Sequence, residues 1–230
     1  VGFKDGKVQE ATASGDVVVG QFNTGGLVGD NNGNLSSVTA ANDVSGIEDV
    51  GGVVGENNGG TIQNATASGN VTAEGSVGGL VGRNDGTIRE SFAVGPVAGD
   101  FRVGGLVGLN TVTVEQSYFD TEATGQTTSA GSATGLTTAQ MQGQAAAENM
   151  ALAFGETWQT VSGDYPELIA LADSDTDSDS NSETDTDLVA EYAGEDDTVG
   201  PFDVITAIDD FRQQQLGPFQ VLEIIQAFRD

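Results

Sequence analysis

The sequence predicts a mainly β fold, a Gly-rich parallel β-solenoid (β-helix) with a mixed α/β C-terminal cap, plus a small separate all-α helical module. The string GGLVG occurs at 25–29, 78–82 and 104–108, and GGVVG occurs at 51–55, so one unit recurs every 26 or 27 residues. The apolar runs are short, rich in Val and Thr, and bounded by Gly, Asn and Asp, as in β-strands. A repeat of this length indicates stacked coils. The alternative is a sandwich or barrel with coincidental repeats.

The repeats occupy residues 1–128. Each GGLVG is followed by a polar turn and a second short strand, as in ENNGGTI (56–62) and NATASGNV (64–71). VGFKDGKV (1–8) aligns with VGENNGGTI (54–62), so the first copy is truncated. We therefore expect the chain to be a piece of a longer protein.

Stacking of the coils predicts ladders of like residues. Leu27, Val53, Leu80 and Leu106 should form one internal ladder, and the valines that follow them should face the opposite way. Two further ladders are expected, Leu35 with Ile62 and Ile88, and Val17 with Val44, Val71 and Val97. The Asn-rich turns suit left-handed backbone conformations.

Residues 129–171 are predicted to cap the solenoid, whose last coil would otherwise expose an open core and an unpaired edge. An amphipathic helix is expected at about 138–153, and a closing strand at 158–168. Residues 172–187 are an acidic Asp/Ser/Thr linker, because they offer almost nothing to bury.

The last segment, 188–230, is internally duplicated. VGPFDVITAIDDFR (199–212) resembles LGPFQVLEIIQAFR (216–229), and each copy places Pro before apolar residues at helical spacing. The candidate docking face consists of these apolar residues: Val204, Ile205, Ile208, Phe211, Val221, Leu222, Ile225 and Phe228.

Composition excludes several functions. The chain has 230 residues, 35 Asp or Glu, 7 Lys or Arg, no His and no Cys, for a formal charge of −28. So acidic a surface excludes nucleic-acid binding through a basic patch. The missing His and Cys exclude the usual zinc sites and His-dependent catalytic triads. No apolar run is long enough to span a membrane. The acidity and scarcity of Lys indicate adaptation to high salt, as in haloarchaeal proteins.

The pattern VGGLVGxNxGTIxxSxAxGxV, as in 77–97, resembles the GLUG repeat, a family found in large secreted and cell-surface proteins, including adhesins and non-catalytic parts of surface proteases. The duplicated tail resembles a dockerin, a module that docks onto a receptor domain and usually binds calcium. Here the calcium loops are degenerate. Asp196 and Asp203 match two ligand positions of the first loop, whereas Gln213 and Gln220 replace acids in the second. The resemblance implies at most weak Ca²⁺ binding, and we expect no other cofactor.

Site chemistry is sparse. No catalytic residue is predicted; the carboxylates Glu90 and Glu115, on successive coils, are more simply explained as solvated side chains. The position after each GGLVG carries Asp30, Glu56, Arg83 and then Leu109. Glycosylation candidates are the sequons at Asn34, Asn64 and Asn70.

The sequence thus predicts a non-enzymatic extracellular or cell-surface module for adhesion or for protein or glycan interaction. Its partners would be a cohesin-like or other cell-surface receptor, bound through 188–230, and glycans. The alternative is an accessory C-terminal region of a secreted protease or carbohydrate-active enzyme whose catalytic domain lies upstream.

Overall fold

The computed structural model describes residues 2–15 and 17–172. The linker beyond Ala172 and the segment 188–230 lie outside the described residues, and with them the docking face and the calcium candidates Asp196 and Asp203. The predictions made for that segment therefore stay predictions.

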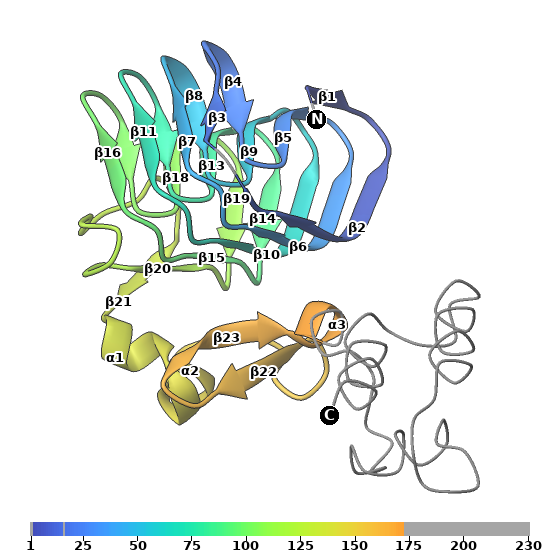
Figure 1. Cartoon of the computed structure of the whole chain (residues 1–230), viewed down its shortest axis with the longest axis vertical. Helices are drawn as coiled ribbons and strands as arrows, with labels where there is room; N and C mark the ends of the chain where they lie inside the picture. The colour runs from blue at the N-terminus through green and yellow to red at the C-terminus, as the bar shows by residue number, and fades with distance from the viewer. Residues whose placement is uncertain (1, 16, 173–230) are drawn as a thin grey trace, which may run out of the picture. The chain divides into compact units, whose positions relative to one another are not determined.

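The described chain is mainly β and forms a parallel β-solenoid of about four turns, as the repeats predicted (Figure 1). Four parallel sheets, A to D, run along it, and each coil contributes in turn to sheets B, C, D and A. Sheet A contains β1 (Phe3–Lys4), β5 (Val28–Asn31), β9 (Val54–Asn57), β13 (Val81–Asn84) and β18 (Val107–Asn110). Sheet B contains β2 (Lys7–Ala13), β6 (Asn34–Ala40), β10 (Thr61–Ala67), β14 (Thr87–Arg89), β15 (Phe92–Ala93), β19 (Thr113–Glu115), β20 (Tyr118–Asp120) and β21 (Thr134–Leu136). Sheet C contains β3 (Val18–Val19), β7 (Val44–Gly46), β11 (Val71–Ala73) and β16 (Val97–Gly99). Sheet D contains β4 (Phe22–Gly25), β8 (Glu48–Gly51), β12 (Val77–Gly78) and β17 (Val103–Gly104).

The interior has two apolar cores. The main core holds residues of sheets A and B, and Leu35, Ile62 and Ile88 stack in it in register, as predicted. A smaller core of valines lies between sheets C and D. There Val44, Val71 and Val97 pair as predicted, but the first coil presents Val18 instead of Val17. The first coil therefore departs by one residue from the register that its sequence suggested, and Val17 is exposed.

The two apolar residues of GGLVG were predicted to face opposite ways, and this prediction was wrong. Leu80 and Val81 are both fully buried in the main core, as are Leu106 and Val107. The Leu position precedes the strand and lies in the corner after the paired glycines, so strand alternation does not apply to it. The corner requires glycine for close approach: a Cβ on Gly78 would stand 2.1 Å from the carbonyl oxygen of Val81.

The end of the solenoid is closed by residues 121–136. This segment follows the last coil and hydrogen-bonds to it, for example from Gly105 N–H to the Thr128 carbonyl and from Ala130 N–H to the Val107 carbonyl. The otherwise unpaired edge of the last coil is thereby satisfied.

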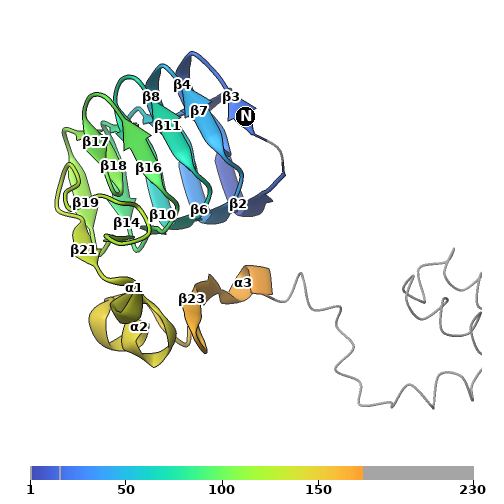
Figure 2. The same ribbon diagram turned by 60° about the vertical axis from the view of Figure 1, so that its left-hand side comes forward.

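Residues 137–172, which we call the brace, pack on the face of sheet B that points away from the main core (Figures 1 and 2). The brace contains α1 (Thr138–Met141), α2 (Gly143–Asn149), the antiparallel hairpin of β22 (Trp158–Val161) and β23 (Asp164–Leu168), and α3 (Ile169–Ala172). The single helix predicted at 138–153 is two short helices, because the chain breaks at Gln142 and Gly143, the latter with φ +58°.

Trp158 is the centre of the brace. Its side chain is fully buried, its ring lies 5.3 Å from that of Phe92, and its Nε1–H donates to the Asn64 Oδ1 at 3.1 Å. At the far end, α3 lies against β2 of the first coil. The brace thus ties the side of the solenoid together across several coils.

Candidate functional site: a polar network on sheet A

The row of residues that follow each GGLVG lies in register along sheet A. Asp30 pairs with Glu56, Glu56 with Arg83, and Arg83 with Leu109. Stacked coils lie about 4.8 Å apart. The side chains of one row are therefore neighbours, and charges of opposite sign on adjacent coils can pair.

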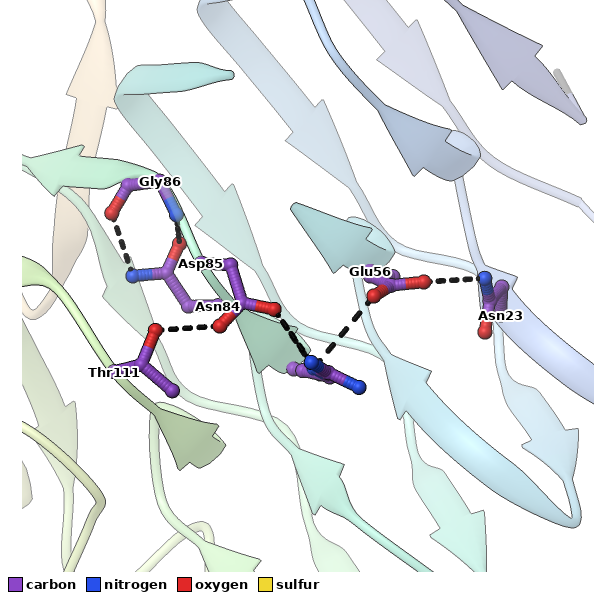
Figure 3. A network of polar contacts seen from close by, with 7 residues as sticks. Asn23, Glu56, Asn84, Asp85, Gly86 and Thr111 are labelled. Atoms are coloured by element: carbon purple, nitrogen blue, oxygen red, sulfur yellow. Dashed lines mark hydrogen bonds and ion pairs between the residues drawn. The ribbon is translucent and has the colours of Figure 1, made fainter. Parts of the chain in front are cut away.

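Five side chains along this face form a continuous network (Figure 3). Asn23 Nδ2 donates to Glu56 Oε2 at 2.7 Å, and Arg83 Nε lies 3.6 Å from Glu56 Oε1. Arg83 Nε and Nη2 both donate to Asp85 Oδ2 at 2.8 Å, and the Thr111 hydroxyl donates to Asp85 Oδ1. The network spans four coils and leaves Arg83 accessible, with 40% of its side chain exposed. It can offer hydrogen-bond acceptors and one guanidinium to a polar ligand.

Asp49 adds an acidic group beside this network. Burial raises the pKa of its carboxyl, while a Ser76 hydrogen bond and the charges of Arg83 and Arg102 partly oppose the shift. Because the pKa of this carboxyl is higher in the folded chain than in the unfolded chain, the folded chain binds more protons. The free energy of unfolding therefore falls as the pH rises above the pKa of the unfolded chain.

Asp49→Asn is therefore expected to leave the free energy of unfolding at neutral pH unchanged or to raise it by up to about 1 kcal/mol, because Asn carries no charge to desolvate. Below the ordinary aspartate pKa of about 3.9, the free energies of unfolding of the two proteins should become equal. Urea unfolding over about pH 3 to 8 measures this. Asp43→Asn is the control of opposite sign: hydrogen bonds from Asn70 lower the pKa of Asp43, so its stabilising contribution is lost as the pH falls.

The prediction that the polar turns adopt left-handed conformations was wrong, because none of its residues has positive φ: Asn31, Asn32, Asn57, Asn58, Asn84 and Asp85. Asn31, Asn57, Asn84 and Asn110 form a ladder in which each Nδ2 donates to the next Oδ1 at 2.7 Å. The first three are fully buried, and none of the four has positive φ. The first coil carries Lys4 in this row, and its Nζ donates to Asn31 Oδ1 at 3.1 Å. These side chains hold the bend between sheets A and B and are not open to a ligand.

Positive φ occurs instead in two other rows. One row, along sheet B, contains Glu10, Ser37, Asn64, Glu90 and Gln116, and the other, along sheet D, contains Asn23, Asp49 and Arg102. The register pairs Glu115 with Arg89 and places Glu90 beside Gln116. Glu90 accepts a hydrogen bond from Gln63 Nε2 at 2.7 Å. The register therefore does not bring Glu90 opposite Glu115.

The three sequons differ in exposure. Asn34 and Asn70 are exposed, and Asn70 Nδ2 donates to Asp43. Asn64 is 8% exposed and lies beneath the Trp158 indole. A glycan on the Asn64 amide does not fit this packing, so burial removes Asn64 from the glycosylation candidates of the folded chain.

The sequence analysis did not predict the structural roles of three side chains, Asp120, Tyr165 and Lys4. Asp120 is fully buried and accepts hydrogen bonds from the N–H groups of Glu122 and Ala123 and from the Tyr165 hydroxyl at 2.7 Å. Burial and this carboxylate raise the pKa of Tyr165 to about 12. Tyr165 lies outside the repeats, and Asp120 has no acidic counterpart on the preceding coils, so no periodicity pointed to the pair. The role of Lys4 could have been found, because the alignment of 1–8 with 54–62 places it on Asn57.

Within residues 2–15 and 17–172, no three or more Asp and Glu side chains gather as a metal site would need. No helix in that part of the chain is long and apolar enough to cross a membrane.

Comparisons with known proteins agree with the repeat pattern. The model of the GLUG motif matches residues 46–72, which form one coil of the solenoid. No curated protein matches the chain. Among solved structures, a Bacteroides ovatus protein provisionally described as an immunoglobulin A1 protease is similar at 19% identity and a TM-score of 0.49. The match covers 71% of this chain and 57% of that one. The chain is thus a β-solenoid with a GLUG motif at residues 46–72.

Proposed function

We propose that this chain is a non-catalytic module that acts outside the cell or at its surface, where the solenoid presents a binding face for adhesion to a protein or glycan. The observation that supports the proposal is the network of Asn23, Glu56, Arg83, Asp85 and Thr111. Its amide, carboxylate, guanidinium and hydroxyl groups follow one another along four successive coils. A long polymer can meet such a face at several points, and linked weak contacts raise the overall affinity.

The GLUG motif is the second support, because similar repeats are expected in secreted and surface proteins. In this proposal the segment 188–230 is the docking unit, bound by a receptor through the apolar face described above, with weak calcium binding at most. The formal charge of −28 suits concentrated salt, in which the Debye length is about 3 Å at 1 M and carboxylate repulsion is screened. The protein would then work in saline surroundings.

The proposal is tested by binding of the full chain to a glycan array and to immobilised polysaccharides in molar salt. We expect one glycan class to be retained, with binding at least about tenfold weaker for the triple variant Glu56→Gln, Arg83→Gln, Asp85→Asn, a loss of about 1.4 kcal/mol. Glu115→Gln, an exposed acid on sheet B, is the matched control and should bind as the unmodified chain does. Equal binding by the triple variant would contradict the role of the network, and release of products from the polysaccharides would contradict a non-catalytic module. Absence of binding to every glycan would exclude a glycan as the partner of this face.

A further inference from the structure

The turns between sheets A and B contain, in the order of the chain, Asp5-Gly6, Asn32-Gly33, Asn58-Gly59-Gly60, Asp85-Gly86 and Thr111-Val112. The turn at 58–60 has one glycine more than the turns before and after it, and it lengthens the repeat from 26 to 27 residues at this point. Two of these turns contain an Asn-Gly pair, at 32–33 and at 58–59. The surroundings of the two pairs differ.

Asn58-Gly59 is open. Asn58 is exposed, and its backbone N–H is fixed to the Asn31 carbonyl at 2.9 Å. Its side chain makes no hydrogen bond to the described residues, and the Gly59 N–H has no acceptor among them. Gly59 adopts φ +81° and has no neighbouring atom within 4 Å of the place a Cβ would take. Nothing holds the Asn58 side chain away from the Gly59 nitrogen.

Asn32-Gly33 is closed. The Gly33 N–H donates to Asn31 Oδ1 at 3.3 Å, and Asn32 is half-buried. A Cβ on Gly33 would stand 2.0 Å from the Gly6 carbonyl oxygen, which shows how closely the first coil covers this turn. The same sequence pair is thus exposed on one coil and clamped on another.

We propose that Asn58 is a site of spontaneous modification, at which the side-chain amide is lost by intramolecular attack. The Gly59 backbone nitrogen attacks Asn58 Cγ, forms a C–N bond and gives up its proton, and the amide nitrogen leaves as ammonia. Water then opens the resulting succinimide, to an aspartate if one carbonyl is hydrolysed and to an isoaspartate if the other is. No cofactor or oxidant is required. Glycine favours the reaction because it has no side chain to obstruct its nitrogen.

The modification changes the charge of the face described above. Asn58 lies in the row of Asp85, because Asn57 pairs with Asn84. The backbone at this position lies one coil, about 4.8 Å, from the Asp85 backbone. Arg83, already surrounded by Glu56, Asp85 and Asp49, would then have a further acidic neighbour on an adjacent coil. The chemical inference stands whether or not this face binds a ligand.

The test is to incubate the full chain at neutral pH and 37 °C and follow both Asn-Gly pairs by peptide mapping with mass spectrometry. Isoaspartate is assayed by enzymatic methylation, and Asn58→Asp supplies the standard for the aspartate product. In the folded chain, Asn58 should convert at least about tenfold faster than Asn32, because Asn32 reacts only after the covering coil opens. In urea, where both pairs are equally exposed, the two rates should agree to within about twofold.

Two outcomes would overturn the inference. One is conversion of Asn32 and Asn58 at equal rates in the folded chain, which would show that the packing does not discriminate. The other is conversion in urea with Asn58 unreacted in the folded chain, which would show that the turn withholds the Gly59 nitrogen.

Discussion

Replacement of Trp158 by alanine is expected to lower the free energy of unfolding by about 3–5 kcal/mol, the range for removal of a buried large aromatic. Trp158 is fully buried, packs against Phe92 and donates to Asn64. Its loss would leave a cavity between the brace and sheet B, and the buried Asn64 Oδ1 would lose its donor. Urea unfolding followed by far-UV circular dichroism measures the effect.

The Trp158→Ala variant should also show which part of the chain loses stability. Because Trp158 joins the brace to sheet B, limited proteolysis under native conditions should cut within 137–172 before it cuts the coils. Phe101→Ala is the control, since Phe101 is 57% exposed and lies outside the brace. An equal loss of stability in both variants, or initial cleavage within the repeats, would refute the role given to the brace.

Asn57→Leu is the second substitution with a large expected effect. Asn57 accepts from Asn31 Nδ2 and donates to Asn84 Oδ1, both at 2.7 Å, and to the Gly60 carbonyl at 3.2 Å. Leucine has a similar size but makes none of these bonds, and a buried polar group left without a partner costs about 1–3 kcal/mol. We expect a total loss of about 3 kcal/mol or more from the three interrupted contacts.

Its control is the next residue. Asn58 is exposed and takes no part in the ladder, so Asn58→Leu should change the free energy of unfolding by less than about 0.5 kcal/mol. Guanidinium unfolding of the two variants side by side decides the matter. If Asn58→Leu lowers the free energy of unfolding as much as Asn57→Leu does, the hydrogen bonds of the ladder do not account for the effect at position 57.

Much of the fold was predictable because the repeat imposes it. A unit that recurs every 26 or 27 residues places like residues on neighbouring coils, so the stacking of Leu35, Ile62 and Ile88 followed from alignment alone. The same logic placed Asp30, Glu56, Arg83 and Leu109 in one row. It could not show that Arg83 joins Glu56 to Asp85, because that depends on side-chain geometry.

Other features depend on contacts that no local pattern contains. The cap predicted at 129–171 has two parts: residues up to 136 close the last coil, and the rest belongs to the brace, which covers sheet B. Phe92 and Tyr118, on the outer face of sheet B, lie buried in one core with Trp158. Asn64 looked like a glycosylation site until the brace was seen to cover it.

By itself, then, the sequence determined the architecture: parallel coils, their period, their glycine corners and the rows along each face. Those are properties of one coil and its neighbour, and repetition makes them readable from spacing. Which polar residues are buried and which are exposed depends instead on how the folded coils pack. Asn57 and Asn58 are adjacent and chemically identical, yet one lies in the interior ladder and the other is open to solvent. The bend of the chain between sheets A and B makes that difference.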